Sequence, residues 1–184
     1  MSFGSLSKAQ AEYVEKVVRG RVVFDLGAGD LGLAYLLVGL GAERVIAIDR
    51  DERMAAKGLK KPQIDWFHMS HDQYLAQNPD QPIDVAFMSW PYNMYDHGLL
   101  KIAQRAKTVV YLGQCTGGTA CGFPQLFQHF LTRKLEAHVP ERPNTLIIVG
   151  ELISEPREAT LEEKGGMDHA AAYSFEGKRM WANS

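Results

Sequence analysis

A glycine-rich turn near the N-terminus constrains the fold of this 184-residue chain more than any other feature. An apolar run at residues 21–26 ends directly in the sequence GAGDLG, residues 27–32. Helical spacing of leucines resumes at 31–39, and a second apolar run follows at 44–48. A strand, a glycine turn, a helix and a further strand make a β-α-β unit, in which the two strands are parallel. The turn therefore predicts an α/β fold built on a parallel sheet.

The same alternation continues along the rest of the chain. We expect helices near residues 9–18, 52–59, 72–77, 96–106 and 124–135, and further strands at 65–69, 83–88, 108–112, 145–152 and 172–181. The last two strands can pair as a hairpin, and the charged segment between them, 154–169, is either a mobile flap or a helix plus loop. The pattern predicts a doubly wound, mostly parallel seven-stranded sheet with an antiparallel C-terminal strand, in three α/β/α layers.

Length and charge narrow the class of protein. A chain of 184 residues with 46% hydrophobic residues can bury one core but is short for two domains, so residues 1–184 are expected to form a single domain. The formal net charge of -2 provides no overall attraction to nucleic acid or to an anionic membrane. The short basic cluster of Lys57, Lys60 and Lys61 is typical of a solvated helix end. The sequence therefore shows no strong signature of nucleic-acid binding.

Targeting and metal signals are also weak. Cys115 and Cys121 fit neither a zinc knuckle nor a redox pair, because both need a closer spacing, and this predicts free thiols in a reducing compartment. The N-terminus does not show a basic start followed by an apolar run, and no apolar stretch approaches the ~20 residues that span a bilayer. We expect a soluble, cytoplasmic protein without a membrane partner. His68, His71 and Asp72 do not converge reliably at their spacing, so no metal is expected.

The acidic residues beside the glycine turn distinguish between two cofactors. The spacing G-x-G-x-x-G, with Asp49 at the end of the next strand, suits a dinucleotide as well as S-adenosylmethionine. Asp25 lies two residues before the first glycine, where it would repel a pyrophosphate but attract the cationic amino-acid moiety of S-adenosylmethionine. The pair of acids therefore favours the methyl donor.

Two segments resemble a known family. FDLGAG at residues 24–29 and VIAID at 45–49 closely resemble the first and second motifs of class I (Rossmann-like) S-adenosylmethionine-dependent methyltransferases. The resemblance implies that the turn lines the methionine end of the cofactor, that Asp49 holds the ribose, and that a residue after the third strand contacts the adenine. For the adenine it offers Ser70, His71 or Asp72, of which we favour Asp72. The expected cofactor-binding set is Asp25, Gly27, Ala28, Gly29, Asp49, Arg50, His71 and Asp72.

A second informative segment follows the fourth predicted strand. Ser89-Trp90-Pro91-Tyr92 resembles the S/N/D-P-P-Y signature of methyltransferases that act on amino groups, with Trp90 in place of the first proline. An amino nitrogen becomes nucleophilic when acceptors such as the Ser89 hydroxyl and the Trp90 carbonyl hold its protons, and Tyr92 would stack on the acceptor. These four residues are the predicted catalytic set. The acceptor is expected to be a small molecule or a nucleobase.

Two other functions use the same features. A nicotinamide-dependent oxidoreductase would employ the same glycine turn. A non-catalytic subunit would bind S-adenosylmethionine without transferring its methyl group. The oligomeric state stays open.

Overall fold

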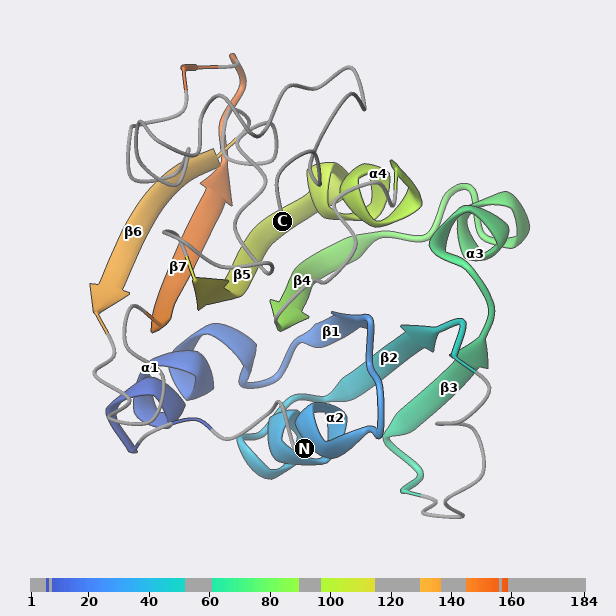
Figure 1. The fold of residues 1–184 in the computed structure, drawn as a ribbon, viewed down its shortest axis with the longest axis horizontal. Helices are drawn as coiled ribbons and strands as arrows, with labels where there is room; N and C mark the ends of the chain where they lie inside the picture. Colours follow the sequence, from blue (N-terminus) through green and yellow to red (C-terminus); the bar gives the residue numbers. More distant parts are fainter. Residues whose placement is uncertain are drawn as a thin grey trace, which may run out of the picture.

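The structure is a computed structural model that describes residues 6, 8–51, 61–89, 97–114, 130–136, 145–155 and 157–158. Figure 1 shows how the helices and strands of these residues alternate along the chain. They are α1 (Lys8–Val18), β1 (Val22–Leu26), α2 (Gly32–Gly39), β2 (Arg44–Asp49), β3 (Ile64–His68), α3 (His71–Gln77), β4 (Ile83–Ser89), α4 (His97–Arg105), β5 (Ala106–Gln114), β6 (Phe130–Glu136) and β7 (Thr145–Leu152).

The strands form one seven-stranded sheet in the order β3-β2-β1-β4-β5-β7-β6. All pairs from β3 to β5 are parallel, and β7 runs antiparallel to both β5 and β6. The predicted mostly parallel sheet with an antiparallel strand near the C-terminus is therefore confirmed. As a result the carboxyl ends of β1, β2, β3 and β4 meet at one edge of the sheet.

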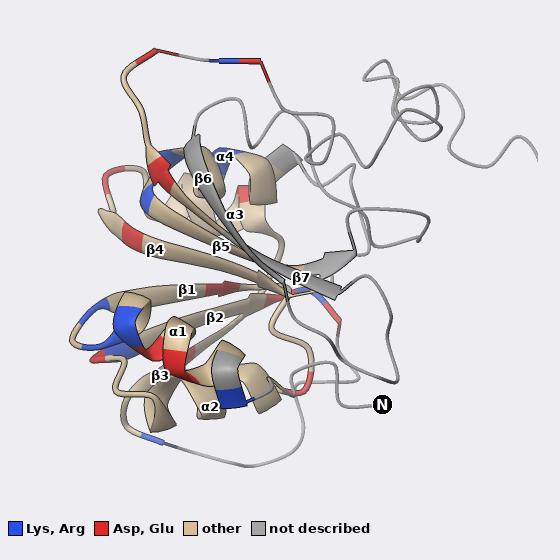
Figure 2. Cartoon of the chain, turned by 90° about the vertical axis from the view of Figure 1, so that its left-hand side faces the viewer, with Lys and Arg blue, Asp and Glu red and all other residues tan. Residues whose placement is uncertain are grey.

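The helices cover both faces of the sheet, as Figure 2 shows, with α1 and α2 on one face and α3 and α4 on the other. Side chains alternate between the two faces along each strand. In β1, Phe24 and Leu26 pack on the side of α3 and α4, and Val23 packs on the side of α1 and α2. The central strands are buried on both faces, which explains their nearly continuous apolar sequences. The predicted three layers are confirmed.

One predicted element has the wrong type. Six of the seven expected strands coincide with strands of the sheet, but residues 130–135 belong to β6 and not to the C-terminal part of a helix over 124–135. The sequence FLTRKLE contains good helix formers, yet pairing with β7 from Phe130↔Leu152 to Glu136↔Leu146 overrides that preference. The predicted strand at 172–181, the helix at 52–59 and most of the segment 154–169 lie outside the described residues.

Candidate functional site

The glycine turn packs against the end of β2. The backbone N–H groups of Gly27 and Ala28 both donate to the carbonyl of Ile48, at 2.9 and 3.1 Å. Gly27 and Gly29 have φ angles of 80° and 51°, in the left-handed region that glycine adopts with little strain. The turn then leads into α2, which begins at Gly32. The sequence prediction of a strand, a turn and a helix is correct to the residue at the end of β1.

Asp49 connects the turn to the segment after β2. Its Oδ2 accepts a hydrogen bond from the Gly29 N–H at 2.7 Å, and its Oδ1 accepts one from the Asp51 N–H at 2.8 Å. The sequence assigned Asp49 to the ribose alone and missed this structural role. A carboxylate offers about four lone-pair sites, so Asp49 retains acceptor capacity for hydroxyl donors after both bonds are made.

Asp25 is the most unusual residue of the turn. Its side chain is buried, with 1% of its surface exposed, and its Oδ2 has no hydrogen-bond partner among the described residues. Burial, together with the nearby charges of Asp49 and Asp30, raises the pKa of this carboxyl group from 3.8 to about 7. A buried carboxylate of this kind is costly until a cation or a donor pairs with it. A cationic ligand would stabilise this carboxylate, because none of the described residues pairs with its Oδ2.

The segment after β3 lies beside Asp49. The Met69 N–H donates to the Asp49 carbonyl at 3.1 Å, and the ring Nε2 of His68 lies 3.2 Å from the carbonyl of Arg50. Arg50 itself is exposed at this edge. The three candidates for the adenine contact therefore follow a segment that is anchored to the end of β2.

The structure assigns those three candidates different surroundings. The Ser70 hydroxyl caps α3 by accepting from the Gln73 N–H at 3.2 Å, within a reciprocal capping box. His71 is buried at the junction between α3 and α4. Asp72 is more than half exposed and pairs with Lys101 at 3.1 Å. Asp72 stays a prediction as the adenine contact, and the pairing with Lys101 was not foreseen.

The predicted catalytic set begins at the same edge of the sheet. Ser89 is the last residue of β4, and β4 is the direct neighbour of β1, with Leu26 opposite Met88. Ser89 therefore ends one strand away from the glycine turn. Trp90, Pro91 and Tyr92 lie outside the described residues.

The described part of the chain offers no grouping of side chains for a metal ion and no membrane-spanning helix. In that part, no three His, Cys, Asp or Glu side chains are arranged to hold a metal ion. No helix in the same residues has the length and apolar character needed to cross a membrane.

Comparison with known proteins gives a result for structure but none for sequence. No protein-family model matches the chain, and no curated protein matches it. A candidate RNA methyltransferase from Pyrococcus horikoshii is similar at 22% identity and a TM-score of 0.54, over 78% of this chain and 81% of that one. A candidate rRNA methylase from Clostridium thermocellum is similar at 16% identity and a TM-score of 0.59, over 82% and 99%. A candidate methyltransferase from Streptococcus mutans, solved with S-adenosylhomocysteine, is similar at 14% identity and a TM-score of 0.51, over 80% of this chain and 99% of that one.

These likenesses show the fold. The chain has the class I, Rossmann-like methyltransferase fold that the two sequence motifs indicated. They also correct the expectation about partners, which found no strong nucleic-acid signature and offered a small molecule or a nucleobase as the acceptor. The lack of a nucleic-acid signature and the small-molecule acceptor are contradicted, because two of these structures carry the names of RNA and rRNA methyltransferases. Net charge sums the whole chain, so it does not exclude a local basic surface.

Proposed function

We propose that this protein is an S-adenosylmethionine-dependent methyltransferase. The observation that carries the proposal is the buried Asp25 carboxyl group, whose Oδ2 has no partner among the described residues and whose pKa is raised to about 7. S-adenosylmethionine is cationic at its amino group and its sulfonium. A pyrophosphate would instead add negative charge beside Asp25, Asp30 and Asp49, and this argues against the nicotinamide cofactor.

The residues of the turn suit each part of this cofactor. Asp25 would accept a charge-assisted hydrogen bond from the amino group, and its proton would leave as the cation arrives. Gly27 and Gly29 present backbone with no Cβ, so the ligand can approach closely. Asp49 would use its remaining lone pairs for the ribose hydroxyls. When bound, the cofactor supplies an electrophilic methyl group, and the protein's task is to hold the acceptor in line with it.

We further propose that the acceptor is an amino nitrogen of an RNA base. Two observations support this choice. Structurally similar proteins carry the names of RNA and rRNA methyltransferases. The segment Ser89–Tyr92 resembles the amino-group signature, and Ser89 ends at the edge of the sheet that holds the glycine turn. Ser89 and the Trp90 carbonyl would hold the amino protons, while Tyr92 would stack on the base.

Calorimetry tests the cofactor. Titration of the full chain with S-adenosylmethionine, S-adenosylhomocysteine and NAD separates the two cofactor classes directly. We expect binding of the first two and none of NAD. Tight binding of NAD, with no binding of S-adenosylmethionine, would overturn the proposal.

Methyl transfer tests the acceptor. Unmodified 16S and 23S ribosomal RNA transcripts are incubated with labelled S-adenosylmethionine, and the digested RNA is searched for N-methylated nucleosides by mass spectrometry. Ser89→Ala and Tyr92→Phe should each reduce transfer while cofactor binding stays intact. Tyr13→Phe in α1 and Ser154→Ala after the end of β7 serve as matched controls. Unchanged turnover in the Ser89 and Tyr92 variants would exclude the amino-group mechanism. Cofactor binding without transfer to any acceptor would favour the non-catalytic subunit.

A further inference from the structure

One face of the edge strand β3 is more open than the centre of the sheet. β3 is the first strand in the sheet order, and among the described strands it pairs with β2 alone. Ile64–Phe67 are partly buried and His68 is exposed, whereas most residues of β1, β2 and β4 are buried. Trp66 packs on the side of α1 and α2, and His68 lies on the same side because side chains alternate along a strand. This face of β3 therefore carries two aromatic rings that the protein does not fully enclose.

The two rings are parallel and held in place. The ring planes of Trp66 and His68 differ by 5°, and the ring centroids are 6.5 Å apart. Rings in direct face-to-face contact lie about 3.5–4 Å apart, so neither ring covers the face of the other. The Nε2 atom of His68 lies 3.2 Å from the Arg50 carbonyl, and it donates because a carbonyl oxygen only accepts. The pair therefore provides an oriented aromatic platform.

Positive charge lies on both sides of this platform along the chain. Arg50 and Lys61 are exposed, and neither forms an ion pair within the described residues. The Lys61 Nζ lies 5.4 Å from the centroid of the Tyr35 ring, a contact that leaves its charge without a carboxylate partner. The acidic residue of β3, Asp65, belongs to the opposite face of the strand and pairs with Arg44. The face with the two rings is therefore suited to an anionic partner.

The platform ends at the edge of the sheet that holds the glycine turn. His68 is the last residue of β3 and lies opposite Asp49, which accepts a hydrogen bond from the turn. In the sheet order β3 is three strands away from β4, whose last residue is Ser89. At about 4.8 Å per strand, this separation is about 14 Å. A polynucleotide with its target base near Ser89 therefore needs only a short further segment to reach β3.

We propose that the β3 surface, formed by Arg50, Lys61, Trp66 and His68, binds an unpaired segment of the RNA acceptor next to the base that is methylated. The inference rests on the proposed methyltransferase function. An unpaired base stacks on the two rings, and the two cations bind the adjoining phosphates. Bases of a duplex are stacked within the helix and do not reach the rings, so this surface favours single-stranded RNA.

Binding of an unstructured RNA tests the stacking part of the proposal. The full chain is titrated into a fluorescently labelled single strand of about 12 nucleotides, a usual site size, and into a duplex of the same length, with anisotropy as the readout. His68→Ala removes the exposed ring of the pair, so the Kd for the single strand should rise on the order of tenfold. His68→Phe keeps a ring at this position and should recover most of the affinity.

Salt dependence tests the charged part of the proposal. Each phosphate contact contributes about 0.7 to the slope of log Kd against log salt concentration for a single strand, so Lys61→Ala should lower this slope by about 0.7. Lys16→Ala in α1 is the matched control, because Lys16 is also exposed and forms no ion pair within the described residues. It removes the same charge and should keep the parental slope.

A parental Kd in His68→Ala, or a parental slope in Lys61→Ala, would overturn the inference. An equal change of slope in Lys16→Ala would also overturn it, because the attraction would then be spread over the whole protein. Tighter binding of the duplex than of the single strand has the same consequence, as does a dimer of the parent that His68→Ala dissociates, since the surface would then bind a second copy. If His68→Ala does not fold, the comparison of Lys61→Ala with Lys16→Ala decides.

Calorimetry with S-adenosylmethionine separates this inference from the proposed function. Lys61→Ala and His68→Ala should bind the cofactor with the parental Kd. Cofactor binding by a parent protein that does not bind the single strand would refute the inference alone. RNA binding that depends on His68 and Lys61, in a parent protein that does not bind the cofactor, would refute the proposed function alone.

Discussion

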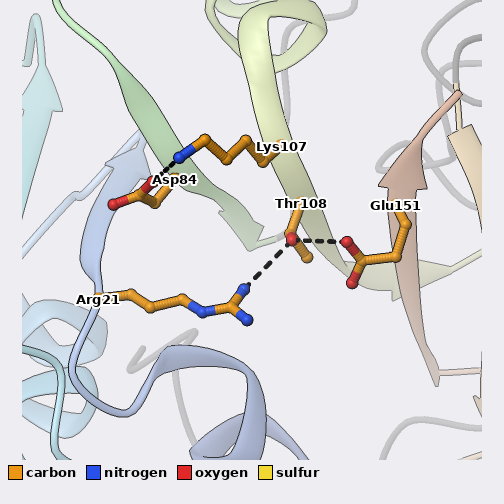
Figure 3. A network of polar contacts seen from close by, with 5 residues as sticks. All are labelled: Arg21, Asp84, Lys107, Thr108 and Glu151. Carbon is orange, nitrogen blue, oxygen red and sulfur yellow. Dashed lines mark hydrogen bonds and ion pairs between the residues drawn. The ribbon is translucent and has the colours of Figure 1, made fainter. Parts of the chain in front are cut away.

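Charged side chains at the two edges of the sheet differ in whether the protein itself provides them with partners. At the amino edge, Figure 3 shows an ion pair and a chain of hydrogen bonds that join three strands and the residue before β1. Lys107 pairs with Asp84 at 2.7 Å. Arg21 donates to the Thr108 hydroxyl at 3.3 Å, and that hydroxyl donates to Glu151 at 3.0 Å. At this edge, charged and polar groups neutralise one another within the protein.

The carboxyl edge is different. Asp25 is buried with two other carboxylates nearby, and the described residues provide no partner for its Oδ2. The backbone at Gly27 and Gly29 adopts positive φ angles that most residues avoid. An arrangement that reduces stability is retained where a ligand can offset its cost. The difference indicates that the amino edge serves stability, whereas the carboxyl edge is suited to binding.

The largest expected effect comes from Asp25→Asn. Loss of a charge-assisted hydrogen bond removes about 1.5–3 kcal/mol, so the Kd for S-adenosylmethionine should rise on the order of 10- to 100-fold. The ligand-free variant should at the same time be more stable, because a buried carboxylate with a raised pKa opposes folding at about pH 8. Calorimetry and thermal unfolding measure the two effects.

Asp84→Asn is the matched control at the amino edge. It removes a carboxylate from an exposed ion pair of the same sheet, so stability should change by less than about 1 kcal/mol and cofactor affinity should stay the same. If both variants weakened binding equally, the contrast between the edges would be lost.

A pH series gives the second largest effect. The folded protein keeps the Asp25 proton up to a pKa of about 7, whereas the unfolded chain releases it near 3.8. The contribution of Asp25 to the free energy of unfolding therefore falls as the pH rises from about 4 to about 7. Because a cationic ligand needs the carboxylate, the affinity for S-adenosylmethionine should increase up to about tenfold per pH unit towards about pH 7 and then level off. A flat profile between about pH 5.5 and 7.5, or a slope that persists in Asp25→Asn, would contradict this prediction.

Two glycines with similar backbone angles allow a finer comparison of the edges. Gly27 at the carboxyl edge has φ 80°, Gly20 at the amino edge has φ 68°, and an added Cβ meets nothing within 4 Å at either position. Replacement by alanine should cost about 1–2 kcal/mol of stability in both cases, since the strain is that of the backbone alone. Only Gly27→Ala should also weaken cofactor binding. Denaturant unfolding and calorimetry measure the two quantities, and equal loss of affinity in both variants would count against the assignment of the turn.

A small effect, confined to stability, is expected from Thr108→Val. The substitution keeps the shape of a buried side chain but removes the hydroxyl that joins Arg21 to Glu151. Unfolding free energy should fall by about 1 kcal/mol, and the Kd for S-adenosylmethionine should not change. A clear change in Kd would show that the polar network of the amino edge is coupled to the site across the sheet.

Local patterns were sufficient for much of the fold. The apolar runs and the glycine spacing predicted the parallel strands and the turn, because each of these signals lies within a few neighbouring residues. The strand at 130–136 could not be predicted in this way, since its partner β7 begins nine residues after it ends and the helical preference of its own residues points elsewhere. The close packing of Gly98 in α4 against His71 in α3 could not be predicted either, because the two helices are separated along the sequence by β4.

For the candidate site, the sequence by itself determined which residues reach the carboxyl edge of the sheet. Asp25, the glycine turn, Asp49 and Ser89 each lie at or beside the end of a strand, and parallel strands bring those ends together. Only the tertiary structure decided how deeply these residues are buried and which hydrogen-bond partners they have. It showed that Asp25 is buried beside other carboxylates, and that each carboxylate oxygen of Asp49 already accepts a hydrogen bond, one from Gly29 of the turn and one from Asp51. Burial, and with it the pKa of a carboxyl group, depends on everything that packs around the side chain, and no short stretch of sequence contains that information.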